Sequence, residues 1–305
     1  RQLIHWIYER KVLSIREITE FSKDLRERLG AVAFISNLSL LNRQTATDGT
    51  EKFLFGLEDG ESIESVLIPD EDRRTLCISS QVGCAMDCRF CLTGALRLRR
   101  NLRAHEIVDQ VIAAGRLLGS ERITNIVFMG MGEPLANFEN VVEAILRITG
   151  FLKFSPRRIT LSTAGLVPGI LELPKRAPLV NLAVSLNAAT DPVRDLLMPV
   201  NRTYPIRTLL DACRRYPVPP RRRITFEYVL LKGINDTPED ASRLVVLLRG
   251  IPAKVNLIPF NPYPGTAFER PVQDVLLAGG LTALIRKSKG GDIGAACGQL
   301  RAGYC

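Results

Sequence analysis

Three cysteines lie close together in the first part of the chain. Cys84, Cys88 and Cys91 follow the spacing Cys-x3-Cys-x2-Cys. Thiolates at this spacing on one loop can bind three corners of a cubane iron–sulfur cluster and leave the fourth iron open. An open iron can bind a substrate, whereas a cluster with four protein ligands only transfers electrons. The alternative is a structural zinc site with Cys77 as fourth ligand, although zinc usually takes paired Cys-x2–4-Cys units separated by a longer loop.

The remaining composition narrows the chemistry further. The 305 residues include seven Cys and only two His. An odd number of thiols, four of them within fifteen residues, indicates metal or redox chemistry rather than a disulfide framework. With so few histidines, an enzyme of this sequence must rely on carboxylates, thiols or a cofactor. Apolar runs such as Ile123–Met131 reach about half the ~18–20 residues that a membrane helix needs, so we expect no membrane span.

Alternating strands and helices are expected to position the cysteine loop. From about Arg73 onward, apolar runs of strand length alternate with segments of helical periodicity, which predicts a parallel sheet covered by helices. Six or so such units favour a partial or complete barrel. The strand-like runs are TLCISS, ITNIVFMG, RITLSTA, VNLAVSLNA, ITFEYVLL, KVNLIPF and LTALIRK. The helical segments are Ala104–Leu118, Asn140–Ile148, Leu209–Arg215 and Glu239–Leu248.

Upstream of this region the pattern differs. Residues 1–29 show apolar stripes at helical spacing. The runs KFLFGL and SIESVLIP flank Glu58-Asp59-Gly60, which predicts a β-hairpin.

Small and polar residues follow the strand-like runs. In a parallel β/α barrel the carboxyl ends of all strands face one mouth, where binding sites are built. We therefore expect these segments to meet at one mouth: Cys77–Gly83, Gly130–Glu133, Ser162–Gly165, Ser185–Asn187 and Asn261-Pro262.

The cysteine spacing, with Phe90 directly before the last cysteine, resembles the radical S-adenosylmethionine (SAM) superfamily. In that superfamily the open iron binds the amino and carboxylate groups of SAM, and electron transfer cleaves SAM to a 5′-deoxyadenosyl radical. Gly130-Met-Gly-Glu133-Pro is similar to the glycine-rich strand end that receives the SAM amino group. Alone, a Gly-x-Gly pair is more often a tight turn, but here it lies one β/α unit after the cysteine loop.

The C-terminal sequence GDIGAACGQL, Gly291–Leu300, is similar to the signature of the RlmN/Cfr-type adenine methyltransferases that act on RNA, and the match is closer to the RlmN branch. Also shared are TLCISSQVGC, FMGMGEPLAN, LSTAGLVPGI, LMPVNRTYP and TFEYVLLKGIND. The resemblance implies an α/β fold, a radical-SAM partial (β/α)6 barrel with a small N-terminal helical module and a β-hairpin extension. We expect an RNA-binding helical module over 1–48, a hairpin linker over 49–70, and the radical SAM core with a C-terminal catalytic cysteine loop over 71–305.

The same resemblance implies the reaction and its residues. Adenine in 23S rRNA or tRNA would be methylated at C2, or at C8 if the chain belonged to the Cfr branch. One SAM methylates Cys297, and the radical from a second SAM abstracts hydrogen from that methyl group, which then adds to the base. Cys77 matches the resolving cysteine, which forms a transient disulfide with Cys297, and Glu64 matches the proton acceptor. Without the resemblance, Glu64 would be read as a solvated strand carboxylate and Cys297 as a buried small hydrophobe.

The cofactors implied are one 4Fe-4S cluster bound by Cys84, Cys88 and Cys91, and two SAM molecules per turnover. The family commonly has His where this chain has Asn187, and Asn keeps hydrogen-bonding capacity without a titratable ring. The SAM contacts carried over are Gly132, Glu133, Ser162, Ser185, Leu186, Asn187 and Asn261.

The net positive charge of the chain indicates a polyanionic partner. The chain has 41 Lys+Arg against 32 Asp+Glu, a formal charge of +9, which suits phosphate contacts with RNA. We further expect a flavodoxin or ferredoxin as electron donor, a monomer, and a cytoplasmic location. The basic groups are Arg97, Arg99, Arg100 and Arg103; Arg157-Arg158; Arg214-Arg215; Arg221–Arg223; and Arg286, Lys287 and Lys289.

Three classes of function stay open at this point. The first is the RNA methyltransferase. The second is another radical SAM enzyme, such as a glycyl-radical activator or an oxidoreductase, which would not need Cys77, Cys297 and Glu64. The third is an RNA-binding protein whose cluster is only structural.

Overall fold

Ten strands form one mixed sheet in the computed structural model, which describes residues 2–271, 283–286 and 288–301. The spatial order is β1-β2-β3-β4-β7-β8-β9-β10-β11-β12, and every pairing from β4 to β12 is parallel. The parallel strands are β4 (Arg73–Cys77), β7 (Asn125–Phe128), β8 (Ile159–Thr163), β9 (Asn181–Ser185), β10 (Ile224–Leu230), β11 (Ala253–Pro259) and β12 (Ala283–Ile285). All seven predicted strand-like runs contain one of these strands, although Leu281 and Thr282 of the last run lie outside the described residues.

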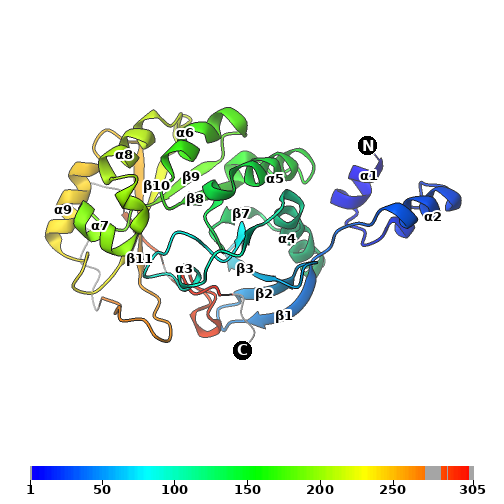
Figure 1. Cartoon of the computed structure of the whole chain (residues 1–305), viewed down its shortest axis with the longest axis horizontal. Coiled ribbons are helices and arrows are strands. Elements are labelled where there is room, and N and C mark those ends of the chain that lie inside the picture. The colour runs from blue at the N-terminus through cyan, green and yellow to red at the C-terminus, as the bar shows by residue number, and fades with distance from the viewer. Residues whose placement is uncertain (1, 272–282, 287, 302–305) are drawn as a thin grey trace.

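Helices separate most of the consecutive parallel strands and lie along the outer side of the sheet (Figure 1). The four predicted helical segments are confirmed as α4 (Ala104–Leu117), α5 (Phe138–Gly150), α8 (Ile206–Arg215) and α9 (Pro238–Leu247). The remaining helices of this region are α3 (Leu92–Ala95), α6 (Val167–Arg176) and α7 (Asp191–Leu197). Short 3₁₀ turns cover Pro134–Asn137, Pro156–Arg158, Pro199–Arg202 and Gly291–Ile293, and a two-stranded ribbon pairs β5 (Gln81–Val82) with β6 (Arg100–Asn101). The predicted α/β fold with repeated β/α units is thus confirmed.

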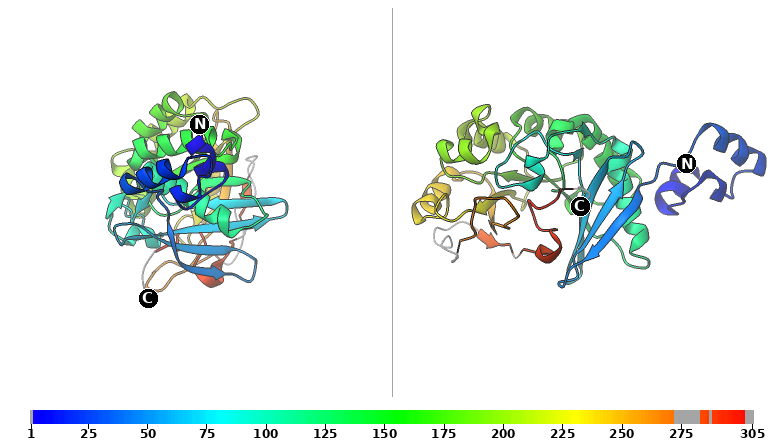
Figure 2. Two further views of the ribbon diagram at one scale, coloured as in Figure 1. Left: turned by 90° about the vertical axis from the view of Figure 1, so that its right-hand side faces the viewer. Right: turned by 60° about the horizontal axis from the view of Figure 1, so that its bottom comes forward.

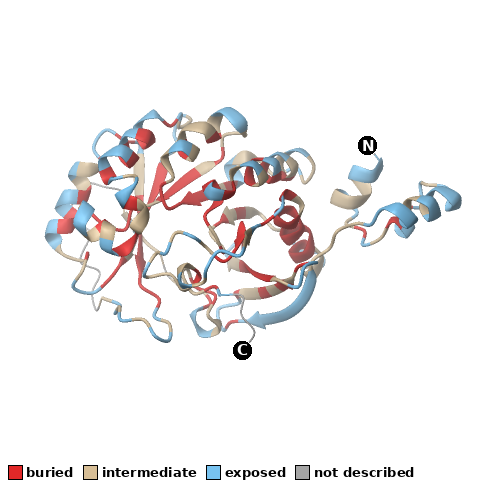
Figure 3. Ribbon diagram, in the orientation of Figure 1, coloured by how far each residue is buried: buried red, intermediate tan, exposed pale blue. Residues whose placement is uncertain are grey.

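The central strands are covered on both faces, which explains their continuous apolar sequences. In β9, Leu182, Ala183 and Val184 are all buried, and in β10 the first five residues are buried. Figure 3 shows the buried residues concentrated in these strands and in the helix faces turned toward them. None of the described helices has both the length and the apolar content needed to cross a membrane.

An antiparallel extension precedes the parallel strands. β2 (Glu51–Gly56) and β3 (Ser62–Asp70) form the predicted hairpin, with Leu54 opposite Glu64, and β3 then pairs with β4. The side chains of β2 alternate, so that Phe53 and Phe55 enter the core while the residues between them face the other side. β1 (Ser39–Thr45), which the sequence did not predict, adds an exposed edge strand to β2.

The N-terminal helical residues project from one end of the molecule (Figure 2). They comprise α1 (Gln2–Ile4), a π-helical turn (His5–Glu9), a 3₁₀ turn (Ile15–Glu17) and α2 (Lys23–Val32). Arg116 of α4 fastens this part by donating hydrogen bonds to the carbonyls of Lys11 and Val12 and to the Asn37 side chain. The expected domain boundary at residue 48 stays a prediction.

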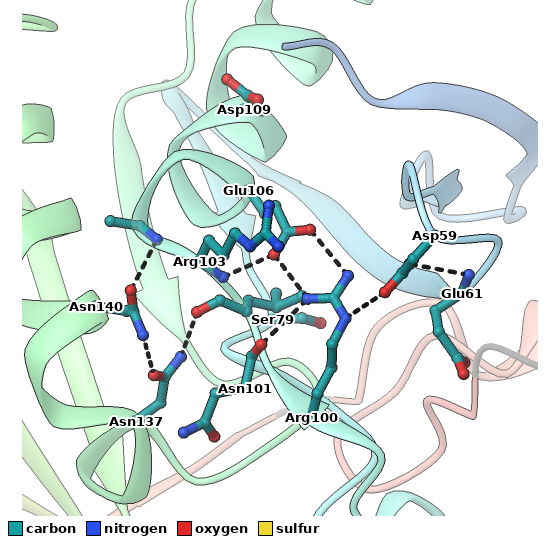
Figure 4. A network of polar contacts seen from close by, with 12 residues as sticks. Asp59, Glu61, Ser79, Arg100, Asn101, Arg103, Glu106, Asp109, Asn137 and Asn140 are labelled. Carbon is teal, nitrogen blue, oxygen red and sulfur yellow. Dashed lines mark hydrogen bonds and ion pairs between the residues drawn. The ribbon is translucent and has the colours of Figure 1, made fainter.

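A polar network joins the hairpin to the loop after the cysteines (Figure 4). The Arg100 guanidinium binds Asp59 at the hairpin turn and makes two hydrogen bonds, of 2.8 and 2.9 Å, to Glu106 of α4. The same Glu106 carboxylate accepts from the Arg103 backbone at 2.7 Å and so caps the start of α4. The Arg100 charge is thus paired with two carboxylates of the protein, and the expected RNA contact of Arg100 stays a prediction.

Asp109 in α4 is a buried carboxyl group that contacts Ser36, in the segment between the N-terminal helices and β1. Burial raises the pKa of Asp109 to about 7, while a 2.9 Å hydrogen bond from Ser36 and the charge of Arg116 act in the opposite direction. Because this pKa lies above that of an unfolded Asp, the native state binds more protons between about pH 4 and 7, and stability from this group falls as pH rises through that window.

We expect Asp109→Asn to remove this loss. The difference in unfolding free energy between the variant and the unmodified protein should increase between about pH 4 and 7, by at most about 4 kcal/mol. Above about pH 7 the difference should stay constant. Urea unfolding followed at several pH values measures the difference. A difference that does not change with pH would contradict the account.

Candidate active site

Four of the five predicted strand-end segments meet at one cavity of about 160 Å³, and Cys77–Gly83 is the segment that does not line it. Its walls come from the cysteine loop, from the ends of β7 to β11, and from the C-terminal segment. Ten of the predicted site residues line it: Cys84, Cys88, Cys91, Gly132, Glu133, Ser162, Ser185, Asn187, Asn261 and Cys297. Leu186, Cys77 and Glu64 are the predicted residues that do not.

The three motif cysteines lie together in the wall of this cavity. Burial raises the pKa of Cys84 to about 12 and also raises the pKa of Cys88 and Cys91. Thiols in this state need a bound metal to become thiolate ligands. Their position on one loop at one cavity is compatible with the expected cluster site.

Glu133 presents a buried carboxylate on the same wall. Its two oxygens accept hydrogen bonds from the backbone N–H groups of Leu135 at 2.9 Å and Ala164 at 2.6 Å. Burial nevertheless raises the pKa of Glu133 to about 7. A carboxylate that lacks solvent and any neighbouring cation is suited to a ligand that brings N–H donors or positive charge.

The two glycines of the same motif serve a close backbone approach. A Cβ atom on Gly130 would lie 2.7 Å from the Ile78 carbonyl, and one on Gly132, where φ is +99°, would lie 2.5 Å from Gln81. The loop can therefore pack against the residues after β4 only with glycine at both positions. Gln81 completes the contact by accepting a 2.8 Å hydrogen bond from the Glu133 backbone.

A buried arginine holds the ends of β8 and β9 in place. Arg194 of α7 is fully buried and donates to the carbonyls of Ala164 at 2.8 Å, Ser185 at 3.1 Å and Leu186 at 3.0 Å. Leu186 itself points into the core and contributes no side chain to the cavity. The sequence analysis missed Arg194, because Asp191 and Asp195 on either side make it resemble an ordinary exposed helix charge.

Asn187 is held by the protein itself. It adopts a left-handed backbone with φ at +57°, which Asn tolerates better than most residues. Its side-chain oxygen accepts from the Val229 backbone at 2.8 Å, and its amide nitrogen lies 3.2 Å from the Met198 sulfur. Its backbone is engaged as well, because its carbonyl accepts from the Asn235 side chain at 2.8 Å and its N–H donates to the Glu227 carbonyl at 3.3 Å. Asn187 therefore connects the end of β9 to β10 and to the residues after β10.

Glu227 on β10 is a second residue that the sequence analysis missed. One of its carboxylate oxygens accepts a 2.9 Å hydrogen bond from Ser162, and the other is buried with no hydrogen-bond partner. The nearest ion-pair partner of that second oxygen is Arg286, at 4.0 Å. An unpaired buried acceptor in a cavity is costly unless a ligand donates to it. A lone carboxylate in the apolar run ITFEYVLL was the available signal.

The C-terminal segment carries Cys297 across the cavity. Asn261 donates to the Cys297 carbonyl at 3.2 Å, and the Leu92 backbone, next to Cys91, donates to the Gly298 carbonyl at 2.7 Å. Thr93 continues this anchoring by donating to the Leu300 carbonyl. Cys297 is thereby fixed at the wall that the cysteine loop also forms.

Cys77 lies at the end of β4, behind this segment. It packs with Met131 and Ala295, two residues before Cys297, in a small apolar cluster. Burial raises the pKa of Cys77 to about 12, a thiolate on Cys297 would raise it further, and the Arg286 guanidinium acts to lower it. Arg286 also shares a small cavity wall with Cys297. The neighbouring basic residue Lys287 lies outside the described residues.

Glu64 lines a second, larger cavity of about 710 Å³ on the other side of the C-terminal segment. The carboxylate lies 3.3 Å from the ammonium of Lys52 and accepts a 2.9 Å hydrogen bond from the Arg301 backbone. The other lining residues include Leu41, Leu92, Tyr263, Asp292 and Gln299. The arrangement thus puts the Glu64 carboxylate at the larger cavity, and Cys297 at the smaller one together with the three motif cysteines and Glu133.

Comparisons with known proteins agree with this geometry. Residues 78–245 match the sequence model of the radical SAM superfamily, and residues 1–35 match that of the ribosomal RNA large subunit methyltransferase N-terminal domain. The chain is 57% identical over its full length to the dual-specificity RNA methyltransferase RlmN of Syntrophobacter fumaroxidans, covering 92% of it. It is 56% identical, over 99% of its length, to the protein of the same name from Geobacter sulfurreducens, covering 85% of that relative.

A solved structure is similar throughout. The crystal structure of a radical SAM methyltransferase from Sphaerobacter thermophilus matches with a TM-score of 0.93 and 46% identity, over 99% of this chain and 92% of that one.

The unpaired oxygen of Glu227 yields a test of what the smaller cavity binds. If hydroxyl groups of SAM donate to this carboxylate, Glu227→Gln should weaken SAM binding about tenfold or more, since a hydrogen bond to a charged group contributes roughly 1.5–3 kcal/mol. Equilibrium dialysis of SAM against protein with matched iron content measures this. Glu172→Gln, on the outer side of α6, is the control, and equal affinity of all three proteins would contradict the role.

Proposed function

This chain belongs to the RlmN family of the radical SAM superfamily, and we propose that it methylates C2 of an adenine in RNA through a methyl group carried on Cys297. Membership establishes a radical SAM enzyme that methylates RNA. The target carbon, the methyl-cysteine and the disulfide are our proposal. The observation that supports it most is that Cys297 lines the same cavity as the three cluster cysteines and Glu133.

The smaller cavity fits the family's cofactors. Cys84, Cys88 and Cys91 would bind the cluster, and Glu133, Ser162 and Glu227 offer acceptors and a hydroxyl for SAM. When bound, the reduced cluster and SAM supply a 5′-deoxyadenosyl radical, and a separate SAM supplies the methyl group. A radical route is needed because C2 of adenine is an electron-poor ring carbon that does not attack SAM directly.

Cys297 acts as the methyl carrier in this proposal. Its thiol takes the methyl group from the first SAM, with loss of the thiol proton. Removal of one hydrogen atom from that methyl group leaves a carbon radical, which adds to C2 and links the base to the protein. The anchoring of residues 297–300 by Asn261, Leu92 and Thr93 keeps the carrier close to the cluster loop during these steps.

Glu64 and Cys77 release the product. One electron would pass from the adduct radical to the oxidised cluster, when this is bound, and the proton on C2 then passes to the Glu64 carboxylate. The Cys77 thiolate then attacks the Cys297 sulfur, so that an S–S bond forms while the S–C bond breaks. The electron pair of that bond stays on the methylene carbon, which takes a proton and becomes the methyl group. Arg286, next to both cysteines, favours the thiolate that this step requires.

RNA reaches the site through the larger cavity. Its volume of about 710 Å³ accommodates a nucleotide, and Glu64 lies on its wall. A base inside a helix cannot enter such a space, so the target adenine must be in a loop or be flipped out of its stack. We propose 23S rRNA and tRNA as substrates, in keeping with the dual-specificity name of the relatives.

Replacement of the carrier thiol tests the proposal. We expect Cys297→Ala to form no methylated RNA above background while still cleaving SAM to 5′-deoxyadenosine, because the cluster ligands are unchanged. Mass spectrometry of nucleosides and of 5′-deoxyadenosine measures both. Cys213→Ala, in the buried face of α8, is the matched control and should retain both activities. RNA methylation by Cys297→Ala at the rate of the unmodified protein would show that the methyl carrier is wrong.

A further inference from the structure

Lys52 and Glu64 face each other across the β-hairpin. Leu54 is the direct partner of Glu64 in the register, so Lys52, two residues earlier on β2, is its diagonal neighbour on the same face. Phe53 and Phe55 lie on the opposite face, in the core. The alternation of the strand therefore turns Lys52 toward the 710 Å³ cavity, where it lines the wall together with Glu64.

The ion pair of Lys52 with Glu64 is largely removed from solvent. The Lys52 Nζ and Glu64 Oε1 atoms are 3.3 Å apart, and the side chains are only 14% and 7% exposed. A carboxylate at this level of burial resists ionisation unless a cation or hydrogen-bond donors compensate it. An exposed ion pair, such as Lys175 with Glu172 on α6, has no comparable effect.

Both oxygens of Glu64 are fixed in position. Oε1 faces Lys52, and Oε2 accepts from the Arg301 backbone at 2.9 Å. Lys52 in turn donates to the Gly294 carbonyl at 3.5 Å, so the ammonium links the hairpin to the segment that leads to Cys297. The larger cavity is also lined by the titratable or charged residues Tyr263, Asp292 and Arg301, and Cys77 lies on the neighbouring strand β4. Further charged residues on the packed strands are Arg43 on β1, Glu51 on β2, Asp70 on β3, and Arg73 and Arg74 on β4.

We propose that Lys52 is a positioning residue that keeps Glu64 ionised and directed into the larger cavity, ready to accept the proton of the target base. This inference rests on the proposed function, because it concerns the proton acceptor of that reaction. In the step itself the C–H bond at the target carbon breaks, its electron pair stays in the ring, and the proton moves to Glu64.

The ammonium also explains how Glu64 is restored after the reaction. Before proton transfer the pair is neutral overall, and afterwards a neutral carboxylic acid faces an uncompensated ammonium. That excess positive charge favours loss of the proton from Glu64 to water in the cavity. Lys52 thus keeps Glu64 ionised before the proton transfer and favours release of the proton afterwards, without contacting the base.

The test measures release of the covalent protein–RNA adduct at a series of pH values in a single turnover, with the adduct separated on a denaturing gel. In Lys52→Gln, we expect the pH of half-maximal release to move upward by about one unit or more. The adduct should then accumulate several-fold at neutral pH. Lys52→Arg should restore the original profile, because it keeps the charge. Lys175→Gln, which removes the lysine of an exposed ion pair, is the matched control and should not change the profile.

A double variant separates this role from a loss of folding. If Lys52 acts through Glu64, the double variant Lys52→Gln/Glu64→Gln should release the adduct as slowly as Glu64→Gln alone. The double variant also leaves no unpaired carboxylate in the interior, so its folding is not penalised by one. A further decrease in the double variant, or an unshifted profile in Lys52→Gln, would overturn the inference. The proposed function fails separately, by the absence of any adduct in Glu64→Gln and Cys77→Ala.

Discussion

The position of the C-terminal segment is the constraint on which the site depends. Residues 297–301 cross the mouth of the sheet and are held there by hydrogen bonds to Asn261, to the Leu92 backbone and to Glu64. These contacts connect the end of β11, the residue after Cys91, and the hairpin. One short segment therefore places Cys297 in the wall of the smaller cavity and Gln299 and Arg301 in the wall of the larger one. If this segment were displaced, both cavities would lose part of their lining.

The sheet supplies the frame for this segment. Parallel pairing from β4 to β12 brings the strand ends together, and Arg194 fixes two of those ends by donating to three carbonyls with its one guanidinium. The glycines at positions 130 and 132 then allow the next loop to approach the residues after β4. The site is consequently preorganised by close backbone packing together with buried side chains, such as Arg194 and Glu133, that hydrogen-bond to the backbone.

The parts of this structure that were predictable from the sequence are local in origin. The cysteine spacing, the glycine motif and the alternation of apolar runs each depend on neighbouring residues, and the structure confirmed the strands and helices that the alternation predicted. Edge strand β1 was missed because all of its residues are exposed, so it has no apolar alternation to detect. Lys52 was missed, and Arg286 was predicted only as an RNA contact, for another reason. Their surroundings depend on strand register and on contacts with segments far away in the sequence, which no local pattern records.

The central claim is that a radical route through Cys297 places a methyl group on C2 of adenine. The most direct measurement is anaerobic reconstitution of the full chain with iron and sulfide, a single turnover with SAM and total RNA, and mass spectrometry of the digested nucleosides. The account predicts 2-methyladenosine. Finding 8-methyladenosine without 2-methyladenosine, or no methylated adenosine from protein that still cleaves SAM, would contradict it.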